Sequence, residues 1–228
     1  MLNQGSTGIR EDAMAAHPPF GDEDLLLVID VQKDFCPGGA LAVPRGDEIV
    51  PVINRLAGNF RRVALTQDWH PAGHRSFASS HAGRQPFESI PMAYGEQTLW
   101  PDHCVQGTPG AALAAALDIP HAELVLRKGC RPEIDSYSAF FENDRRTPTG
   151  LAGYLRERGV RRLYLAGLAF DFCVRWSAED AAAAGFAAII VADACRAIDM
   201  AGSLAQAYVA LSAAGVTMAA AADLSFRS

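Results

Sequence analysis

The chain has 228 residues, of which 50% are hydrophobic and 20% are charged. This length and balance are typical of one globular domain with a substantial buried core, and they argue against a disordered or fibrous protein. Lys and Arg number 20 against 26 Asp and Glu, so the formal net charge is −6. No run of basic residues offsets this charge, and we therefore expect no nucleic-acid partner.

The longest nearly apolar stretches, Ala181–Ala192 and Tyr208–Ala222, are shorter than the roughly 18–20 residues that a membrane span needs. The start of the chain contains no apolar signal core, so we expect neither a membrane partner nor secretion. The 5 cysteines form an odd set without a paired framework. Free thiols of this kind are typical of a reducing compartment, and we predict a cytoplasmic protein.

The beginning of the chain differs in composition from the rest. Residues 1–22 are polar, contain scattered Pro and Gly and show no periodicity, which predicts a flexible N-terminal extension. No internal repeat and no linker rich in Gly, Ser or Pro divides the remainder. We therefore interpret residues 23–228 as a single domain.

Short apolar runs alternate with segments of helical spacing along this domain. The runs predict strands at Leu25–Asp30, Arg62–Thr66, Glu123–Arg127, Arg162–Ala166, Ala187–Ala192 and Val216–Ala220. The other segments predict helices at Asp47–Leu56, Gly150–Arg158, Cys173–Ala184 and Met200–Ala213. Strands separated by helices favour an α/β fold, here a three-layer α/β/α sandwich around a mainly parallel sheet of about six strands.

Reactive side chains come directly after several of the predicted strands. Asp30 ends the first strand, and Asp68 and His70 follow the second. Lys128 follows the third strand, and Cys173 lies beyond the fourth. Because ligands of parallel sheets bind beyond the carboxyl ends of the strands, we expect these five side chains to converge on one site.

Cys173 opens a segment of strongly helical composition. A thiol at a helix N-terminus is favoured as thiolate, and the free N–H groups there can hold an oxyanion. Asp30, buried at a strand end, can move the thiol proton, and Lys128 can balance the negative charge. The alternatives are an inert buried cysteine, an aspartate that caps a turn and a solvated lysine.

Asp68 and His70 are two residues apart, so both side chains point to one face of an extended segment. With His74 and His103 they predict a mixed nitrogen and oxygen site that suits Zn²⁺, Fe²⁺ or Mn²⁺. The alternative is a polar turn at residues 68–70 and a surface histidine at 103. His81 and His121 have no such context.

Five segments in the same order resemble the nicotinamidase/pyrazinamidase family, within the isochorismatase-like hydrolases. They are Ile29–Val43, Thr66–His81, Trp100–Gly110, Arg127–Gly129 together with Asp135–Asn143, and Gly167–Ala181. The resemblance extends from about residue 25 to the C-terminus.

The resemblance implies a catalytic triad of Asp30, Lys128 and Cys173. It implies an oxyanion hole from the N–H groups of Ala169 and Cys173, after a cis peptide bond at Leu168–Ala169. One divalent metal ion, zinc before iron or manganese, is expected on Asp68, His70 and His103, with His74 as a fourth ligand or as a neighbour of the site. The implied substrate pocket consists of Phe35, Leu41, Trp100, Tyr137, Leu168 and Phe172.

The implied reaction is hydrolysis of nicotinamide to nicotinate and ammonia through a thioester on Cys173, with pyrazinamide as a second substrate. One alternative is a related hydrolase that acts on a carbamoyl, ureido or isochorismate substrate. Another is a non-catalytic domain that binds a pyridine or a partner protein. A redox thiol protein is disfavoured because the chain has no C-x-x-C pair. The sequence leaves the oligomeric state open, and a homo-oligomer is compatible with it.

Overall fold

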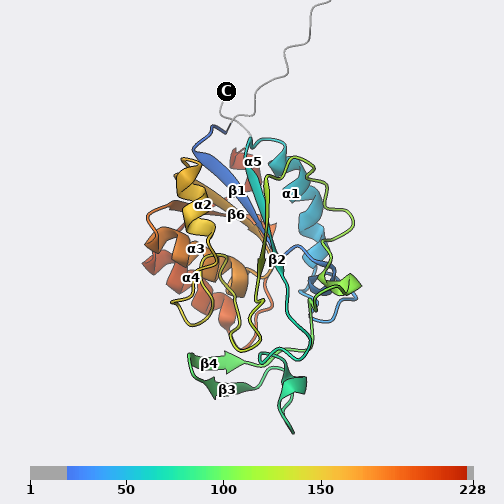
Figure 1. The fold of residues 1–228 in the computed structure, drawn as a ribbon. Helices are drawn as coiled ribbons and strands as arrows, with labels where there is room; N and C mark the ends of the chain where they lie inside the picture. Colours follow the sequence, from blue (N-terminus) through green and yellow to red (C-terminus); the bar gives the residue numbers. More distant parts are fainter. Residues whose placement is uncertain (1–19, 225–228) are drawn as a thin grey trace, which may run out of the picture.

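The computed structural model describes residues 20–224, and residues 1–19 and 225–228 lie outside the described part. Its main sheet has six strands in the order β5-β2-β1-β6-β7-β8 (Figure 1). The strands are β1 (Asp24–Ile29), β2 (Val63–Asp68), β5 (Leu124–Lys128), β6 (Arg162–Gly167), β7 (Ala187–Cys195) and β8 (Thr217–Ala219). Every neighbouring pair is parallel, so all the carboxyl ends lie at one edge.

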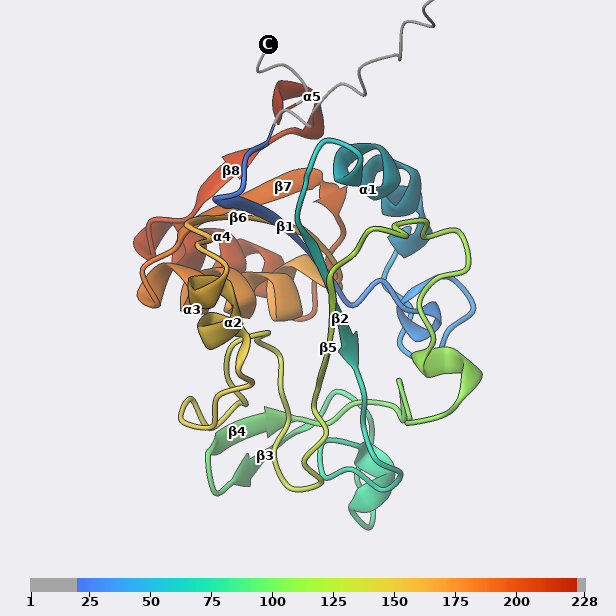
Figure 2. The same ribbon diagram turned by 45° about the horizontal axis from the view of Figure 1, so that its top comes forward.

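Helices cover both faces of the sheet (Figures 1 and 2). One face carries α1 (Val50–Ala57) and α5 (Ala221–Leu224), and the other carries α2 (Leu151–Glu157), α3 (Arg175–Ala183) and α4 (Ser203–Ala213). Side chains of β1 alternate between two apolar cores, with Leu26 and Val28 in one and Leu25 and Leu27 in the other. A strand buried on both faces is apolar throughout, as this one is. The predicted α/β/α sandwich is confirmed.

All six predicted strands and all four predicted helices occur near their expected positions, with shifted ends. The segment predicted as one helix over 47–56 is a 3₁₀ turn, Gly46–Ile49, followed by α1. The helix predicted to begin at Cys173 is different: a single π-helical turn, Phe170–Val174, precedes α3, which begins at Arg175. Cys173 therefore lies inside that turn and not at the first residue of an α-helix.

A two-stranded antiparallel hairpin, β3 (Ser89–Met92) and β4 (Gly95–Thr98), has no counterpart among the predicted elements. It lies beyond the carboxyl end of β2, at the lower end of Figure 1. It belongs to the long connection between β2 and β5, which also contains the 3₁₀ turns Ala78–Ser80 and Pro109–Ala111. This connection closes the edge of the sheet where the reactive side chains were expected.

The packed part of the chain begins earlier than residue 23. Phe20 is only 4% exposed, and its ring stacks on that of Phe60 with 4.0 Å between the centroids. It also contacts Tyr164 on β6. Residues 1–19 of the predicted extension lie outside the described residues.

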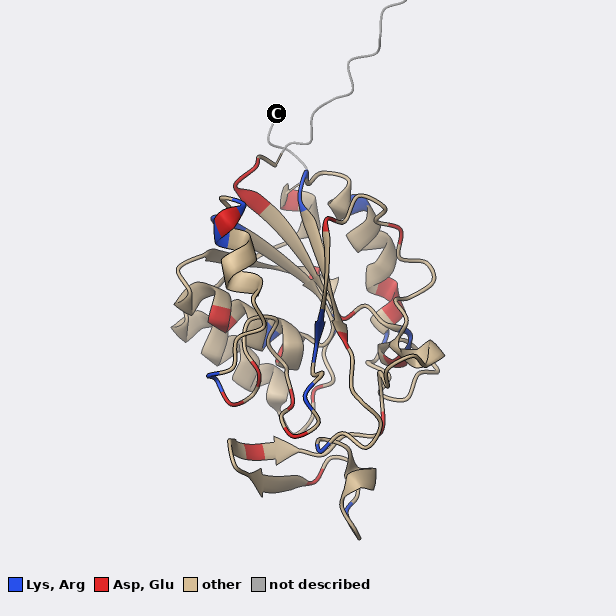
Figure 3. Cartoon of the chain, in the orientation of Figure 1, with Lys and Arg blue, Asp and Glu red and all other residues tan. Residues whose placement is uncertain are grey.

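Basic and acidic residues lie beside one another on the view in Figure 3, with no basic stripe. Arg162 forms a bidentate pair with Asp24, and Arg62 pairs with Glu123. No helix in the described residues is long and apolar enough to cross a membrane.

Candidate active site

The register of the parallel strands brings three charged side chains together. Asp68, the last residue of β2, pairs directly with Lys128, the last residue of β5. Asp30 follows β1, which lies on the other side of β2. All three residues are at least 96% buried, although charged groups are rarely buried unless they are paired. The predicted convergence at the strand ends is therefore present.

Asp30 adopts a left-handed backbone conformation, with φ of 49°, as β1 ends. Asp tolerates this region better than most residues. The Asp30 N–H donates to Oγ1 of Thr66 at 3.1 Å, and the Thr66 hydroxyl donates to Oδ1 of Asp30 at 2.6 Å. Burial raises the pKa of Asp30, and the nearby Lys128 only partly offsets this effect. The carboxylate is therefore a stronger base than an exposed aspartate.

Lys128 contacts both carboxylates of the site and the thiol. Its Nζ lies 2.9 Å from Oδ2 of Asp30 and donates to the carbonyl of Ser136 at 2.7 Å. It also donates to Oδ1 of Asp68, and it lies 3.5 Å from Sγ of Cys173. Burial lowers the pKa of Lys128, but the two carboxylates outweigh burial and hold that pKa well above its usual value. The ammonium group thus stays charged.

Cys173 is 6% exposed, and its Sγ lies within 4.8 Å of carboxylate oxygens of both Asp30 and Asp68. Burial raises the pKa of the thiol well above its usual value, and the Lys128 ammonium group only partly reverses this. This direction is opposite to the one expected for a thiol at a helix N-terminus, because burial outweighs the charge of Lys128. A neutral thiol needs a base to become a nucleophile, and Asp30 is in reach.

The turn before Cys173 begins with a cis peptide bond at Leu168–Ala169, as the resemblance implied. The preceding residue is Gly167, where a Cβ atom would lie 2.0 Å from the carbonyl oxygen of Ile29. Only glycine allows β6 to approach β1 this closely. Within the described residues, the Ala169 N–H donates no hydrogen bond to the chain. It is therefore available to a ligand oxygen.

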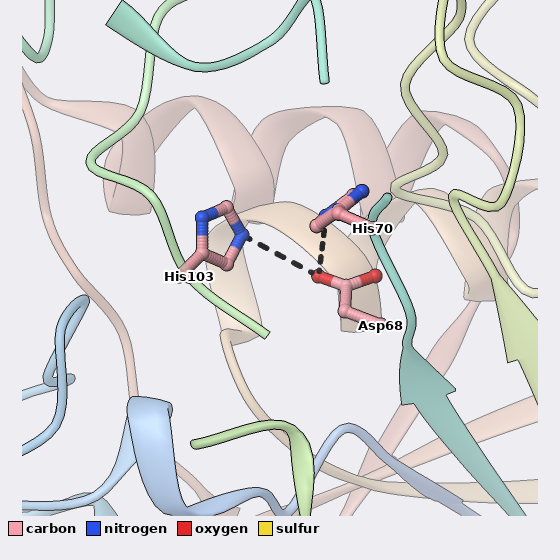
Figure 4. A group of neighbouring side chains, drawn as sticks. All are labelled: Asp68, His70 and His103. Atoms are coloured by element: carbon pink, nitrogen blue, oxygen red, sulfur yellow. Dashed lines mark ion pairs between the residues drawn. The ribbon is translucent and has the colours of Figure 1, made fainter. Parts of the chain in front are cut away.

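Asp68, His70 and His103 form a second group of side chains (Figure 4). Oδ2 of Asp68 lies 3.7 Å from Nε2 of His70 and 3.8 Å from Nε2 of His103. Nδ1 of His70 faces the Gly129 carbonyl at 3.0 Å, and Nδ1 of His103 faces the Pro101 carbonyl at 2.8 Å. A carbonyl only accepts, so each Nδ1 carries the proton and each Nε2 presents a lone pair.

This donor set suits a divalent metal ion. One ligand atom from each of the three residues lies within 4.8 Å of the others. Nε2 of His70 is buried without a hydrogen-bond partner, which is costly unless something else occupies its lone pair. Two imidazole nitrogens and one carboxylate oxygen, with positions left open, are typical of zinc and iron sites.

His74 lies beside this group, with its ring centroid 4.5 Å from that of His70. Its Nε2 donates to the Arg131 carbonyl at 2.8 Å, and its Nδ1 accepts from the Ser76 N–H at 3.2 Å. Burial lowers the pKa of His74. Both ring nitrogens are thus occupied, and of the two predicted alternatives the geometry favours a neighbour of the site over a ligand.

A cavity lies between the two groups. Its lining consists of Phe35, Leu41, Asp68, Trp100, His103, Asp135, Tyr137, Ala169, Phe172, Cys173 and Ile198. Five of the six predicted pocket residues are among them, whereas Leu168 is fully buried in the core beside Gly46. The free space is about 20 Å³, enough for one water molecule, so the cavity is narrow.

Sequence reasoning missed two lining residues. Asp135 opens one of the segments that carry the resemblance, but its own role gave no signal. Its carboxylate accepts from the Ser136 N–H at 2.8 Å and from Nε2 of Gln97 at 2.9 Å, and it lies 4.0 Å from Nε2 of His70. Ile198 lies in an irregular loop after β7, where no pattern marks it.

Comparison with known proteins identifies the family. The family model described as an isochorismatase domain matches residues 24–223, which is most of the chain. The chain therefore belongs to the isochorismatase family. Among curated members of this family, a nicotinamidase of Acinetobacter baylyi is 56% identical over 191 residues, covering 84% of this chain and 89% of that protein.

Two solved structures of the isochorismatase family are also similar. A nicotinamidase/pyrazinamidase of Acinetobacter baumanii is 52% identical, with a TM-score of 0.89, over 90% of this chain and 99% of that one. A pyrazinamidase of Pyrococcus horikoshii, solved in complex with zinc, is 34% identical with a TM-score of 0.71. That comparison covers 87% of this chain and 99% of the other.

Proposed function

We propose that this chain is a nicotinamidase that hydrolyses nicotinamide to nicotinate and ammonia, and that it also accepts pyrazinamide. The observation that carries the proposal is one cavity lined by the thiol of Cys173 together with Asp68 and His103. Asp30 and Lys128 lie beside the thiol, and His70 lies beside Asp68. The similarity to nicotinamidases of two Acinetobacter species, at 56% and 52% identity, supports the same assignment.

The first half of the reaction forms a thioester. Asp30 takes the proton of the Cys173 thiol, and the sulfur attacks the carboxamide carbon. The N–H groups of Ala169 and Cys173 stabilise the oxyanion that develops. Asp30 then returns the proton to the nitrogen, the C–N bond breaks and ammonia leaves. Lys128 stays charged throughout and stabilises the two neighbouring anionic groups.

The second half consumes one water molecule. Asp30 takes a proton from that water, which attacks the thioester carbon. The C–S bond breaks, the proton returns from Asp30 to the Cys173 sulfur, and the nicotinic acid that forms releases its own proton to water to give nicotinate. The same carboxylate thus acts as base and acid in both halves, which suits its raised pKa.

We assign one divalent metal ion to Asp68, His70 and His103, with zinc preferred and iron or manganese as alternatives. When bound, it supplies a Lewis-acidic anchor that positions a ring nitrogen. The zinc complex of the similar pyrazinamidase supports this assignment. His74 holds the ring of His70 in place through their contact.

The cavity distinguishes nicotinamide from the substrates of other family members. Its aromatic and aliphatic lining suits a flat heteroaromatic ring. The described lining contains no lysine or arginine that could pair with a carboxylate of an acyclic amide. We therefore favour nicotinamide over carbamoyl, ureido or isochorismate substrates.

The state of the thiols supports a reducing location. All five cysteines lie in the described residues and are free: Cys36, Cys104, Cys130, Cys173 and Cys195. We place the protein in the cytoplasm on this ground. A homo-oligomer remains compatible with the structure of the single chain.

The test is ammonia release from nicotinamide by the purified protein, with and without a chelator, followed by metal analysis. We expect turnover that falls on chelation and returns when zinc, iron or manganese is added. Maleamate and N-carbamoylsarcosine serve as acyclic comparison substrates. Faster turnover of either one than of nicotinamide would contradict the proposal.

A further inference from the structure

Asp171 lies two residues before Cys173, inside the π-helical turn, and is 1% exposed. It has no part in the proposed chemistry. Its Oδ1 accepts from the Ile198 N–H at 3.1 Å, and its Oδ2 accepts from the Asp199 N–H at 2.8 Å. The Ser203 hydroxyl also donates to Oδ2. One buried carboxylate thus binds two backbone donors from the segment between β7 and α4 and the hydroxyl of the first residue of α4.

That segment, residues 196–202, has no regular secondary structure. Asp199 and Ala201 both have positive φ, at 55° and 51°, which non-glycine residues adopt only when their surroundings hold them there. The backbone N–H groups of Ile198 and Asp199 both donate to Asp171. We conclude that the Asp171 carboxylate determines the course of this loop.

The loop matters because Ile198 lines the catalytic cavity with Phe35, Leu41, Trp100 and Phe172. Ile198 is half-buried and packs against the core that contains most of these residues. The other lining residues come from β2, from the turn at Cys173 or from the connections that follow β1, β2, β5 and β6. Because the free space is only about 20 Å³, a few methyl groups on one wall decide what fits.

We propose that Ile198 is a specificity-determining residue and that Asp171 is a positioning residue that acts through it. This inference rests on the proposed function. Held by Asp171, the Ile198 side chain restricts the cavity to unsubstituted six-membered heteroaromatic carboxamides. Bicyclic carboxamides, such as quinoline-3-carboxamide, are excluded because they need the space that Ile198 occupies.

A direct role of Asp171 in proton transfer is disfavoured by its contacts. Both carboxylate oxygens are occupied by donors of the loop and of Ser203. The thiol of Cys173 is instead surrounded by Lys128 and the carboxylates of Asp30 and Asp68. Asp171 is also absent from the described lining of the catalytic cavity.

The experiment compares Ile198→Ala, Ile198→Val, Asp171→Asn and the double variant Asp171→Asn/Ile198→Ala. Two control variants match them. Asp199→Asn makes the same chemical change on an exposed side chain of the same loop, and Asn tolerates positive φ. Ile189→Ala removes a half-buried isoleucine from β7, within the strand rather than at the cavity. Circular dichroism melting checks that each variant is folded.

We expect Ile198→Ala to raise KM for nicotinamide about 10-fold or more, while kcat stays within about 3-fold of the wild-type value. The reason is that the lost apolar contacts weaken binding of the ground state and of the transition state alike. It should also gain turnover of quinoline-3-carboxamide, and Ile198→Val should do so to a smaller extent. Asp171→Asn should raise KM as well. The double variant should match Ile198→Ala within about 2-fold, since Asp171 acts through the same side chain. Both controls should resemble the wild type.

The outcomes separate the two proposals. A metal-loaded wild type that releases no ammonia from nicotinamide overturns the proposed function, and the inference falls with it. The inference alone is overturned if the wild type is active but the folded Ile198 variants keep its KM for nicotinamide and do not turn over the bicyclic amide. A double variant with multiplied losses, or an Asp171→Asn effect confined to kcat, overturns the positioning role of Asp171.

Discussion

The ammonium group of Lys128 donates a hydrogen bond to Oδ1 of Asp68, whose other oxygen faces the two imidazoles of the proposed metal site. The same ammonium group pairs with Asp30 at 2.9 Å. One buried cation therefore joins the proposed catalytic group to the proposed metal site. Burial raises the pKa of Asp68, but its surroundings, the Lys128 ammonium group foremost, outweigh burial and hold that pKa well below its usual value.

Replacement of Lys128 by Met should destabilise the fold and abolish activity. It leaves two buried carboxylates without their cation, and loss of one partner of a buried ion pair costs about 3–5 kcal/mol. The chain contains one other lysine, Lys33, whose side chain is exposed. Lys33→Met is therefore the matched control. The free energy of unfolding from urea titration measures the difference, and equal stability of the two variants would contradict the prediction.

The gathering of reactive side chains at the ends of the strands could be predicted because the sheet is parallel. The apolar runs at Leu25–Asp30 and Glu123–Arg127 lead directly into Asp30 and Lys128, so the sequence predicts these two residues at one edge of the sheet. The fold followed from the same alternation of strands and helices. The roles proposed for these residues came from the chemistry of their side chains and from the family resemblance.

Features that depend on long-range packing could not be predicted. The position of Ile198 depends on Asp171, 27 residues away in the chain, and no local pattern reports such a contact. The raised pKa of Cys173 results from burial, which a helical composition does not reveal. The β3–β4 hairpin consists of two four-residue strands that lack the β-branched and aromatic enrichment of typical strands.

Replacement of Cys173 by Ala should reduce ammonia release by at least about 10⁴-fold, because the nucleophile is removed. Metal content should stay unchanged, since the three proposed ligands are untouched. Cys130→Ala is the control, because that thiol is exposed and does not line the cavity. An ammonia assay together with elemental analysis checks both statements. Retained turnover would eliminate Cys173 as the nucleophile.

The pH dependence of kcat/KM should change when Thr66 is replaced by Val. The Thr66 hydroxyl donates to Oδ1 of Asp30 and thereby lowers the pKa of that carboxyl, which burial raises. Asp30 must be ionised to accept the thiol proton, so activity is lost as the pH falls through its pKa. Without the hydroxyl this pKa rises further, and the acid limb should move upward by about 1 pH unit.

The alkaline limb should stay in place in Thr66→Val, because that limb reports groups which do not contact Thr66. Thr217→Val, at an exposed position on β8, should leave both limbs unchanged. Full profiles of kcat/KM from pH 4 to about pH 10 provide the measurement. An acid limb that moves downward, or a rate that rises steadily with alkali without any acid limb, would contradict Asp30 as the base.

Metal affinity should distinguish His74 from the proposed ligands. Replacement of His70 or His103 by Ala removes a coordinating nitrogen and should leave the protein without stoichiometric metal. His74→Gln removes only a supporting contact, so the affinity should fall by about 10–100-fold. His121→Ala, at an exposed position, is the control. Competition with a chromogenic chelator measures the affinities, and a complete loss of metal in His74→Gln would instead identify His74 as a ligand.

Replacement of Phe20 by Ala should reduce the free energy of unfolding by about 3 kcal/mol, because a buried aromatic side chain is lost and leaves a cavity against Phe60 and Tyr164. Phe87→Ala is the matched control, since that ring is 51% exposed and its loss should cost much less. Catalysis should be unaffected in Phe20→Ala at temperatures where the protein is folded, because Phe20 packs at the amino ends of the strands, opposite the site. Urea titrations of both variants measure the effect, and equal stability would show that the folded domain does not depend on residue 20.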